Sequence, residues 1–440
     1  MKPVVSLIRY RDITSVAEAV DTCNGFAKLK RHYCVLLKPN ICTAQAGFFP
    51  PFGTVTTTSV IEGVVCALKD FGVNDISLGE GTVLDELGTN TKQGFSWIDL
   101  NRLKKRYGIK LVDFNAGPHK KIVIREVPMN IAEAVLKTDF FINLPVLKTH
   151  IAARVSLSGK NLKGCMSMAS KKYFHGKKGT LHYHISQLME AIRQDLVIID
   201  GIYVMDNGPD ASTGTAHPKG ILVASTDFLA ADSVGTRILG SEPEEIEHLR
   251  IYAERNGRMD ILKNEGAIEV VGERVSDHSS FVPWQSVTGK DLKDSGHTGI
   301  EIKEIRNTVC SGCYANLTGP TLLLSALSKN KDFNNLRIIV GKNIRDDRNS
   351  PRTFLFGNCA VKENRNLDKA KKITGCPPNF FKSCFIIANQ MEGLGGRFLF
   401  FSRLFLYFLR AGFKVGMLPL ERYKIYKNNP DFRIEHYRIK

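Results

Sequence analysis

The sequence predicts an α/β fold, a mostly parallel sheet with flanking helices, together with a smaller C-terminal four-cysteine domain. Two observations predict the first part: β-rich runs alternate with amphipathic stretches through the first 240 residues, and polar residues recur directly after those runs. Such alternation is typical of a parallel sheet covered by helices. The third observation is the crowding of cysteines between Cys310 and Cys384, which predicts the second part.

The expected elements follow one another in chain order. Apolar, β-branched runs predict strands at residues 3–8, 33–37, 75–78, 110–114, 139–144, 196–199 and 220–224. Helical spacing of apolar residues predicts helices at 13–29, 57–71, 97–107 and 185–193. Hydroxyl groups at residues 56–59 and the carboxylate of Asp227 stand where an N-cap stabilises the start of a helix.

Composition shifts predict three regions along the 440 residues. An α/β domain spans residues 1–276, a cysteine-rich domain 277–385, and an aromatic and basic tail 386–440. Within the tail, Arg403 and Arg410 interrupt the apolar stretch 397–420 and make it too charged for a secure membrane span. Two alternatives remain for this stretch: an amphipathic helix in peripheral contact with a membrane, or a helix packed against the protein or a second subunit.

The overall composition restricts the class of protein. With 43% hydrophobic and 24% charged residues the chain is expected to be globular. No secretory signal is recognisable near Met1, which predicts a cytoplasmic location, with peripheral membrane contact as an addition. The net charge of +17 favours anionic ligands, acidic partners or anionic membranes. Nucleic acid is not an expected partner, because no nucleic-acid-binding motif accompanies the charge.

Polar residues recur where the predicted strands end. They are Lys38, Asn40, Glu80, Lys148, His150, Asp200 and Asp206. Ligands of open parallel sheets bind beyond the carboxyl ends of the strands, so these side chains are expected to share a site. Each of them alone is equally well explained as an ordinary loop residue.

A lysine-rich motif, residues 158–164, adds candidate ligand-binding groups. Small residues beside Lys160 and Lys163 allow the backbone to approach an anion, while the ammonium groups supply positive charge. The order of residues is not that of a phosphate-binding P-loop. The substrate-binding set predicted from both patterns is Lys38, Asn40, Lys148, Lys160, Asn161 and Lys163. His150 and Glu80 are the candidates for proton transfer.

Four cysteines beside glycines form the strongest chemical signal. Cys310 and Cys313 make a C-x-x-C pair, while Cys359 and Cys376 are single cysteines, the first two residues after Gly357 and the second directly after Gly375. Four thiolates are the usual ligands of a [4Fe–4S] cluster. Structural zinc, which also accepts four thiolates, is the alternative, although zinc ribbons usually contain a second C-x-x-C pair.

Several motifs together resemble the domain of unknown function 362 family. They are Lys38-Pro39-Asn40, Gly79-Glu80-Gly81, the run 144–150, the run 160–164, Asp200-Gly201 with Gly208-Pro209, and Asp227 to Asp232. The resemblance covers residues 38–240 and implies a prokaryotic protein, often linked with ferredoxin-type iron–sulfur domains. It does not supply a reaction. The single four-cysteine set departs from family members that carry eight cysteines.

Two functions of different classes are compatible with the sequence. The first is a redox enzyme with an iron–sulfur cluster that acts on a small anionic substrate and exchanges electrons with a partner protein. The second is a non-catalytic electron carrier or scaffold docked on a membrane or an acidic partner. A zinc-stabilised anion-binding protein is a further alternative. No dinucleotide-binding fingerprint is present, so a nicotinamide or flavin cofactor is not expected.

Overall fold

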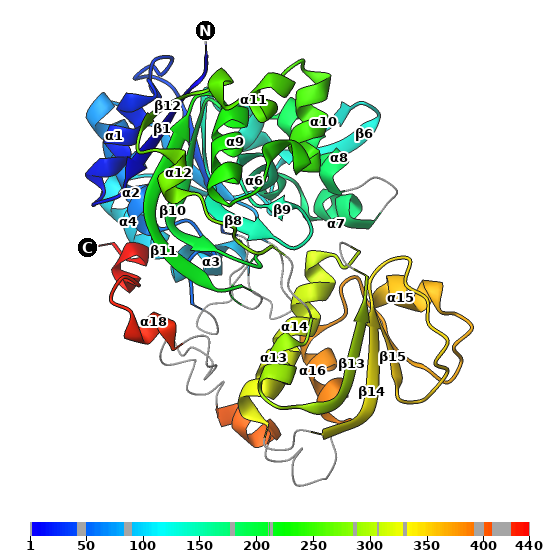
Figure 1. Cartoon of the computed structure of the whole chain (residues 1–440). Helices are drawn as coiled ribbons and strands as arrows, with labels where there is room; N and C mark the ends of the chain where they lie inside the picture. The colour runs from blue at the N-terminus through cyan, green and yellow to red at the C-terminus, as the bar shows by residue number, and fades with distance from the viewer. Residues whose placement is uncertain are drawn as a thin grey trace. The chain divides into compact units, whose positions relative to one another are not determined.

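A computed structural model describes residues 2–41, 50–82, 90–176, 181–209, 211, 214–284, 288–305, 308–328, 332–390, 400–406 and 424–439. Figure 1 shows the whole chain coloured from the N-terminus to the C-terminus. Its contacts divide it into two compact units. The first unit comprises Met1–Gln45, Pro51–Trp284 and Asn429–Lys440, and the second comprises Ala46–Pro50 and Gln285–Asn428.

The first unit is built on a mixed sheet in which the central strands are parallel. In sheet order the strands are β12 (Glu269–Gly272), β1 (Val4–Arg9), β11 (Ala216–Ser225), β10 (Leu196–Met205), β7 (Phe140–Leu144), β2 (Val35–Pro39), β3 (Ile76–Glu80) and β4 (Lys110–Asp113). The strands from β10 to β4 pair in parallel, while β11 runs antiparallel to both of its neighbours. The prediction of a mostly parallel sheet is therefore confirmed.

Helices flank this sheet. One group contains α1 (Thr14–Thr22) and α2 (Thr58–Phe71), which pack against each other. A second group contains α6 (Ser158–Asn161), α8 (Leu181–Ala191), α9 (Phe228–Ile238) and α10 (Glu247–Arg255), and α9 contacts β10 and β11. Figure 1 shows the two groups on opposite sides of the sheet. The strands between them are almost fully buried, as both faces of a parallel sheet usually are.

The order of the strands places a topological switch point between β2 and β7. From β2 the chain continues through β3 and β4 on one side, and it then returns to β7 and β10 on the other side. The connections that leave β2 and β7 therefore diverge at the carboxyl end of this strand pair. In open α/β sheets such a divergence is the usual place for a ligand.

Some elements differ from their predicted limits because of individual backbone positions. The helix predicted at 13–29 ends at Thr22, and Asn24 has a φ of 54°, a left-handed conformation that does not continue a helix. The helix predicted at 97–107 begins at Leu100, after Asp99 with a φ of 62°. In contrast, β10 continues to Met205, well beyond the predicted strand at 196–199.

The second unit contains a smaller sheet whose strands are all parallel. Their order is β13 (Thr298–Glu304), β14 (Asp332–Val340), β15 (Thr353–Phe356) and β16 (Lys371–Ile373). The principal helices are α14 (Ser311–Leu327), α15 (Gly357–Glu363) and α16 (Phe380–Ala388). Because the strands are parallel, the segments that follow them leave from the same edge of the sheet.

The end of the chain packs against the first unit. Phe432 stacks on Tyr203 with ring centroids 5.5 Å apart, and both rings lie 5.0 Å from Phe52. The hydroxyl of Tyr203 accepts a hydrogen bond from the backbone N–H of Arg433 at 2.9 Å. The sequence predicted one continuous tail over residues 386–440, but its last residues contribute to the core of the first unit.

No helix within the described ranges is both long enough and apolar enough to cross a membrane. Of the stretch 397–420, which was predicted to contact a membrane or pack on protein, the structure describes only residues 400–406. Phe405 and Leu406 there are 63% and 49% exposed. The remainder of the stretch lies outside the described residues.

The N-cap of α9 provides a first testable prediction. Asp227 accepts hydrogen bonds from the backbone N–H groups of Leu229 and Ala230, as the sequence predicted, and also pairs with Arg258 at 2.6 Å. Replacing Asp227 with alanine removes these contacts, so we expect the free energy of unfolding to fall by about 1–2 kcal/mol. Asp227→Asn, which retains the capping oxygen, should recover most of the loss in urea titrations. Equal losses for the two variants would contradict the assignment of Asp227 as a cap.

Candidate functional site

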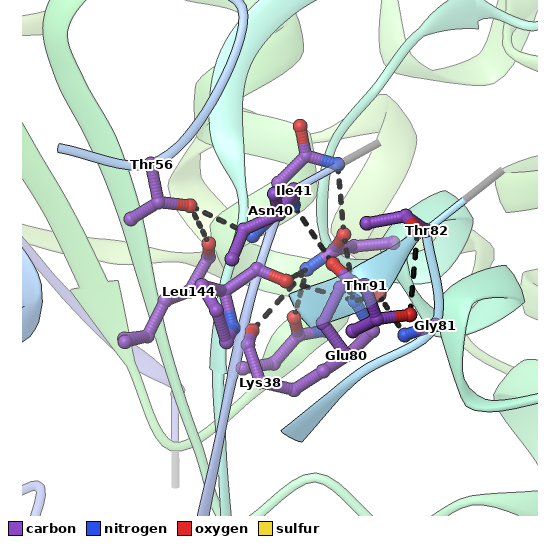
Figure 2. A network of polar contacts seen from close by, with 12 residues as sticks. Lys38, Asn40, Ile41, Thr56, Glu80, Gly81, Thr82, Thr91 and Leu144 are labelled. Carbon is purple, nitrogen blue, oxygen red and sulfur yellow. Dashed lines mark hydrogen bonds and ion pairs between the residues drawn. The ribbon is translucent and has the colours of Figure 1, made fainter. Parts of the chain in front are cut away.

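A buried polar network lies at the switch point between β2 and β7 (Figure 2). Lys38, near the end of β2, is fully buried and forms an ion pair with Glu80 at the end of β3, with Nζ 2.9 Å from each carboxylate oxygen. The same Nζ donates to the carbonyl of Pro39 at 2.8 Å and to Oδ1 of Asn161 at 3.2 Å. The backbone N–H of Ile41 donates to the carboxylate of Glu80 at 2.8 Å.

A second buried lysine extends the network. Lys148 lies in β8 (Val146–His150), a strand that directly follows β7 and pairs with β10. Its Nζ donates to Oδ1 of Asn40 at 2.8 Å and to the carbonyls of Thr54 and Pro209 at 2.6 and 2.8 Å. Asn40 in turn donates to Oδ1 of Asn161 at 3.0 Å, which connects the two lysines.

The structure thus brings together five of the residues that the sequence pattern placed in one site: Lys38, Asn40, Glu80, Lys148 and Asn161. Each of the two buried ammonium groups has three N–H donors, and protein oxygens accept from all three. A ligand anion can bind either lysine directly only by displacing one of these partners. In this conformation the network therefore holds the ends of the strands in place.

The other predicted site residues have different surroundings. Lys160 and Lys163 are partly exposed in the segment around α6. His150 is buried at the end of β8, and its Nδ1 accepts from the backbone N–H of Ala152 at 3.0 Å. Asp206 follows β10 and pairs with His217 at 2.9 Å.

Asp200 was expected directly after a strand, but it lies within β10 because that strand continues to Met205. Its carboxylate is buried and accepts from the backbone N–H groups of Thr57 and Ile202 at 2.6 and 3.0 Å. Burial raises the pKa of Asp200 to about 6. Since Thr57 is the N-cap of α2, Asp200 fixes the start of that helix on the sheet.

Some members of the network were not predicted. The hydroxyl of Thr56 donates to the carbonyl of Leu144 at 2.7 Å and joins the ends of β2 and β7 (Figure 2). The side-chain amide of Asn161 donates to Oδ1 of Asn143, a fully buried residue of β7. The sequence pattern offered Thr56 only as an N-cap candidate, and no signal distinguishes Asn143 from an ordinary polar residue of a strand.

The glycine of the lysine-rich motif has a packing role. A Cβ atom at Gly164 would lie 2.1 Å from Oε1 of Glu80 and 2.7 Å from Nζ of Lys38. The sequence suggested that small residues here let the backbone approach an external anion. In the structure, the backbone at Gly164 approaches the internal Lys38–Glu80 ion pair.

Gly164→Ala should therefore disrupt the ion pair. The added methyl group cannot be accommodated without moving two buried charges, and we expect the free energy of unfolding to fall by about 2–3 kcal/mol. Gly266→Ala is the matched control, because its Cβ would meet only the side chain of Asn264, at 3.1 Å or more. Chemical denaturation of both variants measures the difference. If Gly164→Ala lowered the free energy of unfolding no more than Gly266→Ala does, the packing around Gly164 would not be restrictive.

In the second unit the four cysteines follow three strands of the parallel sheet. Cys310 is the N-cap of α14, after β13, and Cys313 lies in the first turn of that helix. Cys359 lies in the first turn of α15, directly after β15. Cys376 follows β16. The three cysteine-bearing segments, here called the cysteine loops, leave from the same edge of the sheet.

Hydrogen bonds and close packing join the cysteine loops. Gly375 donates to the side chain of Asn358 at 2.9 Å, and the N–H of Asn358 donates to the carbonyl of Gly375 at 3.0 Å. Asn316 in α14 donates to the carbonyl of Pro378 at 2.7 Å. A Cβ at Gly357, whose φ is 86°, would lie 3.1 Å from Sγ of Cys313. Glycine at this position is therefore required by both the conformation and the proximity of the thiol.

The four thiols influence one another electrostatically. A hydrogen bond from Cys313 lowers the pKa of Cys310 to about 6, and the same bond raises the pKa of Cys313. The charges of Cys376 and Cys359 raise the pKa of Cys313 further. Burial, followed by the charge of Cys310, raises the pKa of Cys359. The cysteine loops thus bring the four predicted ligands into one neighbourhood.

Among the described residues, no set of three or more His, Cys, Asp or Glu side chains is arranged so that it could hold a metal ion as it stands. The donor type nevertheless fits a thiophilic metal centre, because four thiols without a disulfide neighbour one another on glycine-containing turns. Metal binding at such a centre is coupled to the folding of the residues that hold it.

The match to a protein family lies mainly in the first unit. A family model described as a domain of unknown function, DUF362, matches residues 35–237. The thylakoid-associated protein sll1697 of Synechocystis sp. is 28% identical over 217 residues, which are 48% of this chain and 64% of that protein. The chain therefore spans somewhat less than two thirds of the length of this curated relative.

Two solved structures match about half of this chain at 11% sequence identity. The lactate racemase apoprotein from Thermoanaerobacterium thermosaccharolyticum has a TM-score of 0.30 over 50% of this chain and 54% of its own. A crystal structure of a protein from Thermotoga maritima has a TM-score of 0.33 over 56% of this chain and 60% of its own. The residues that carry the sequence resemblance lie within the matched family segment. The resemblance to the domain of unknown function 362 family is thus confirmed for residues 35–237.

Proposed function

We propose that the second unit holds a [4Fe–4S] cluster on Cys310, Cys313, Cys359 and Cys376, and that the protein is a redox enzyme acting on a small anionic substrate. The observation that carries the proposal is the meeting of the cysteine loops at one edge of a parallel sheet. Four thiolates at such an edge suit an iron–sulfur cluster. A partner protein would supply electrons to this cluster or accept electrons from it.

The surroundings of the thiols support a cluster ahead of zinc. Zinc ribbons usually bind their ion between two C-x-x-C turns, whereas here Cys359 and Cys376 come from separate strands. Lys342 follows β14, and its positive charge acts on the thiols of Cys310 and Cys359. A cation there would offset part of the negative charge that four thiolates bring to a cluster.

The substrate is proposed to bind in the first unit, at the switch point between β2 and β7. The partly exposed Lys160 and Lys163 supply positive charge beside the buried network. A non-catalytic electron carrier or scaffold is the alternative. Turnover of a small anion with a chemical electron donor would exclude that alternative.

We further propose peripheral membrane contact through residues 397–420. The exposed side chains of Phe405 and Leu406 beside Arg403 suit the boundary between acyl chains and anionic headgroups. The curated relative is described as thylakoid-associated, which agrees with contact of this kind. Flotation with vesicles containing anionic lipid, compared with purely zwitterionic vesicles, tests it. Equal recovery with both vesicle types would contradict an electrostatic contribution.

Anaerobic purification followed by iron, sulfide and zinc analysis tests the proposed centre. We expect about four irons and four sulfides per chain and a brown chromophore that bleaches with dithionite. One zinc per chain without sulfide would instead assign a structural site. If the protein contained neither iron nor zinc after purification and reconstitution under anaerobic conditions, both assignments would be rejected.

A further inference from the structure

A third buried lysine, Lys171, lies beside the network in the first unit. It belongs to α7 (Met168–Gly176) and is only 7% exposed. Its Nζ donates to the carbonyl of Gly81 at 2.6 Å and to Oδ1 of Asn115 at 2.8 Å. Gly81 follows β3 and Asn115 follows β4, so Lys171 sits at the same edge of the sheet as the Lys38–Glu80 pair.

The number of acceptors distinguishes Lys171 from the other two buried lysines. Lys38 and Lys148 each contact enough oxygens for the three N–H donors of an ammonium group. Lys171 has two acceptors among the described residues, both of them uncharged. A neutral amine has two N–H donors and one lone pair, so the geometry around Lys171 matches the amine and leaves its lone pair available.

Burial and the neighbouring charges act on the pKa of Lys171 in different directions, and burial dominates. Burial is the largest cause of a pKa lowered to about 8, and the positive charge of Lys38 in β2 acts in the same direction. Glu80 in β3, Cys165 and Asp113 in β4 act in the opposite direction without offsetting the burial. A lysine with this pKa is about one-quarter amine at pH 7.5, compared with roughly 0.1% for a lysine with the reference pKa.

We propose that Lys171 is a reactive amine that forms an imine with a small carbonyl compound. Its lone pair attacks the carbonyl carbon, the N–C bond forms as the C=O π bond breaks, and a proton moves from nitrogen to oxygen. Loss of water from this carbinolamine then gives the C=N bond, with no net oxidation or reduction. This activity belongs to the first unit alone and does not depend on the metal content of the second.

Reductive trapping with glyoxylate and cyanoborohydride tests the proposal on the full-length folded protein. Hydride from cyanoborohydride reduces the imine to a stable carboxymethyl-lysine, which peptide mass spectrometry locates. Lys172, the next residue, is exposed and serves as the internal control. At pH 7.5 we expect Lys171 to be modified about tenfold faster than Lys172, after allowing for its restricted access. Modification no faster than that of Lys172 would overturn the proposal.

A variant separates amine chemistry from mere accessibility. Asn115→Asp puts a carboxylate 2.8 Å from Nζ, where it favours the ammonium form. Labelling of Lys171 at pH 7.5 should then fall by about tenfold and recover at higher pH, while that of Lys172 stays constant. Circular dichroism confirms that the variant is folded. An unchanged rate at Lys171 would show that its protonation state does not control the reaction.

Discussion

Replacing Cys313 with alanine should abolish the iron–sulfur centre. Four thiolates satisfy the four irons of a cubane cluster, and the loss of one ligand leaves an iron exposed to solvent and the cluster prone to decay. We expect iron and sulfide to fall from about four each per chain to below about one, with loss of the brown absorption. Anaerobic purification and metal analysis of the variant measure this directly.

The same substitution at a cysteine outside the cysteine loops provides the control. Cys34 is exposed in the first unit and donates a hydrogen bond to Asp75 at 3.2 Å. Cys34→Ala should leave the iron and sulfide content unchanged. If Cys313→Ala retained a full complement of both, Cys313 could not be a ligand. If the wild-type protein contained zinc and Cys313→Ala lost it, the four-thiolate site would stand with a different metal.

The sequence was sufficient to predict part of the polar network of the first unit. Lys38, Asn40 and Glu80 follow strands that prove to be neighbours and parallel, and the carboxyl ends of such strands meet at one edge. Asn161 was added from the lysine-rich motif, residues 158–164. These predictions succeeded because they depend on strand order and chain direction, which the alternation of elements reveals.

What the sequence could not provide was the partner of each charge. A lysine after a strand gives the same sequence pattern whether its side chain faces solvent or a buried carboxylate. Here the close packing of Gly164 against Glu80 shows that the carboxylate is buried. For the same reason the sequence does not distinguish Lys171 from its exposed neighbour Lys172. Its burial depends on contacts with Gly81 and Asn115, which are far from it in the sequence.

The limits of β10 show a second reason why prediction from the sequence was wrong. Beyond residue 199 the sequence contains Asp200 and Gly201, which usually end a strand. The strand continues because Asp200 accepts backbone hydrogen bonds from Thr57 and Ile202 and because β11 pairs along its length. Tertiary contacts therefore outweigh the local preference, and Asp200 lies inside the sheet rather than in a loop.

Lys38→Met should be among the most destabilising single substitutions in the first unit. The side chains of Lys38 and Glu80 are 0% and 2% exposed, so removing the ammonium leaves a carboxylate buried without its counter-charge. Breaking a buried pair from one side typically costs about 3–5 kcal/mol. We expect a loss of this size in the free energy of unfolding, measured by urea titration monitored by circular dichroism.

The double variant Lys38→Met with Glu80→Gln identifies the cause of that loss. If the penalty comes from the uncompensated carboxylate, neutralising it should restore about half or more of the stability, because the buried negative charge is then absent. Lys110→Met is the matched control, since Lys110 pairs with Asp75 at 2.8 Å while the two side chains are 68% and 41% exposed. There the loss should be at most about 1 kcal/mol. A double variant no more stable than Lys38→Met would place the penalty in the lost packing of the lysine side chain instead, and the network would then hold the strand ends by shape rather than by charge.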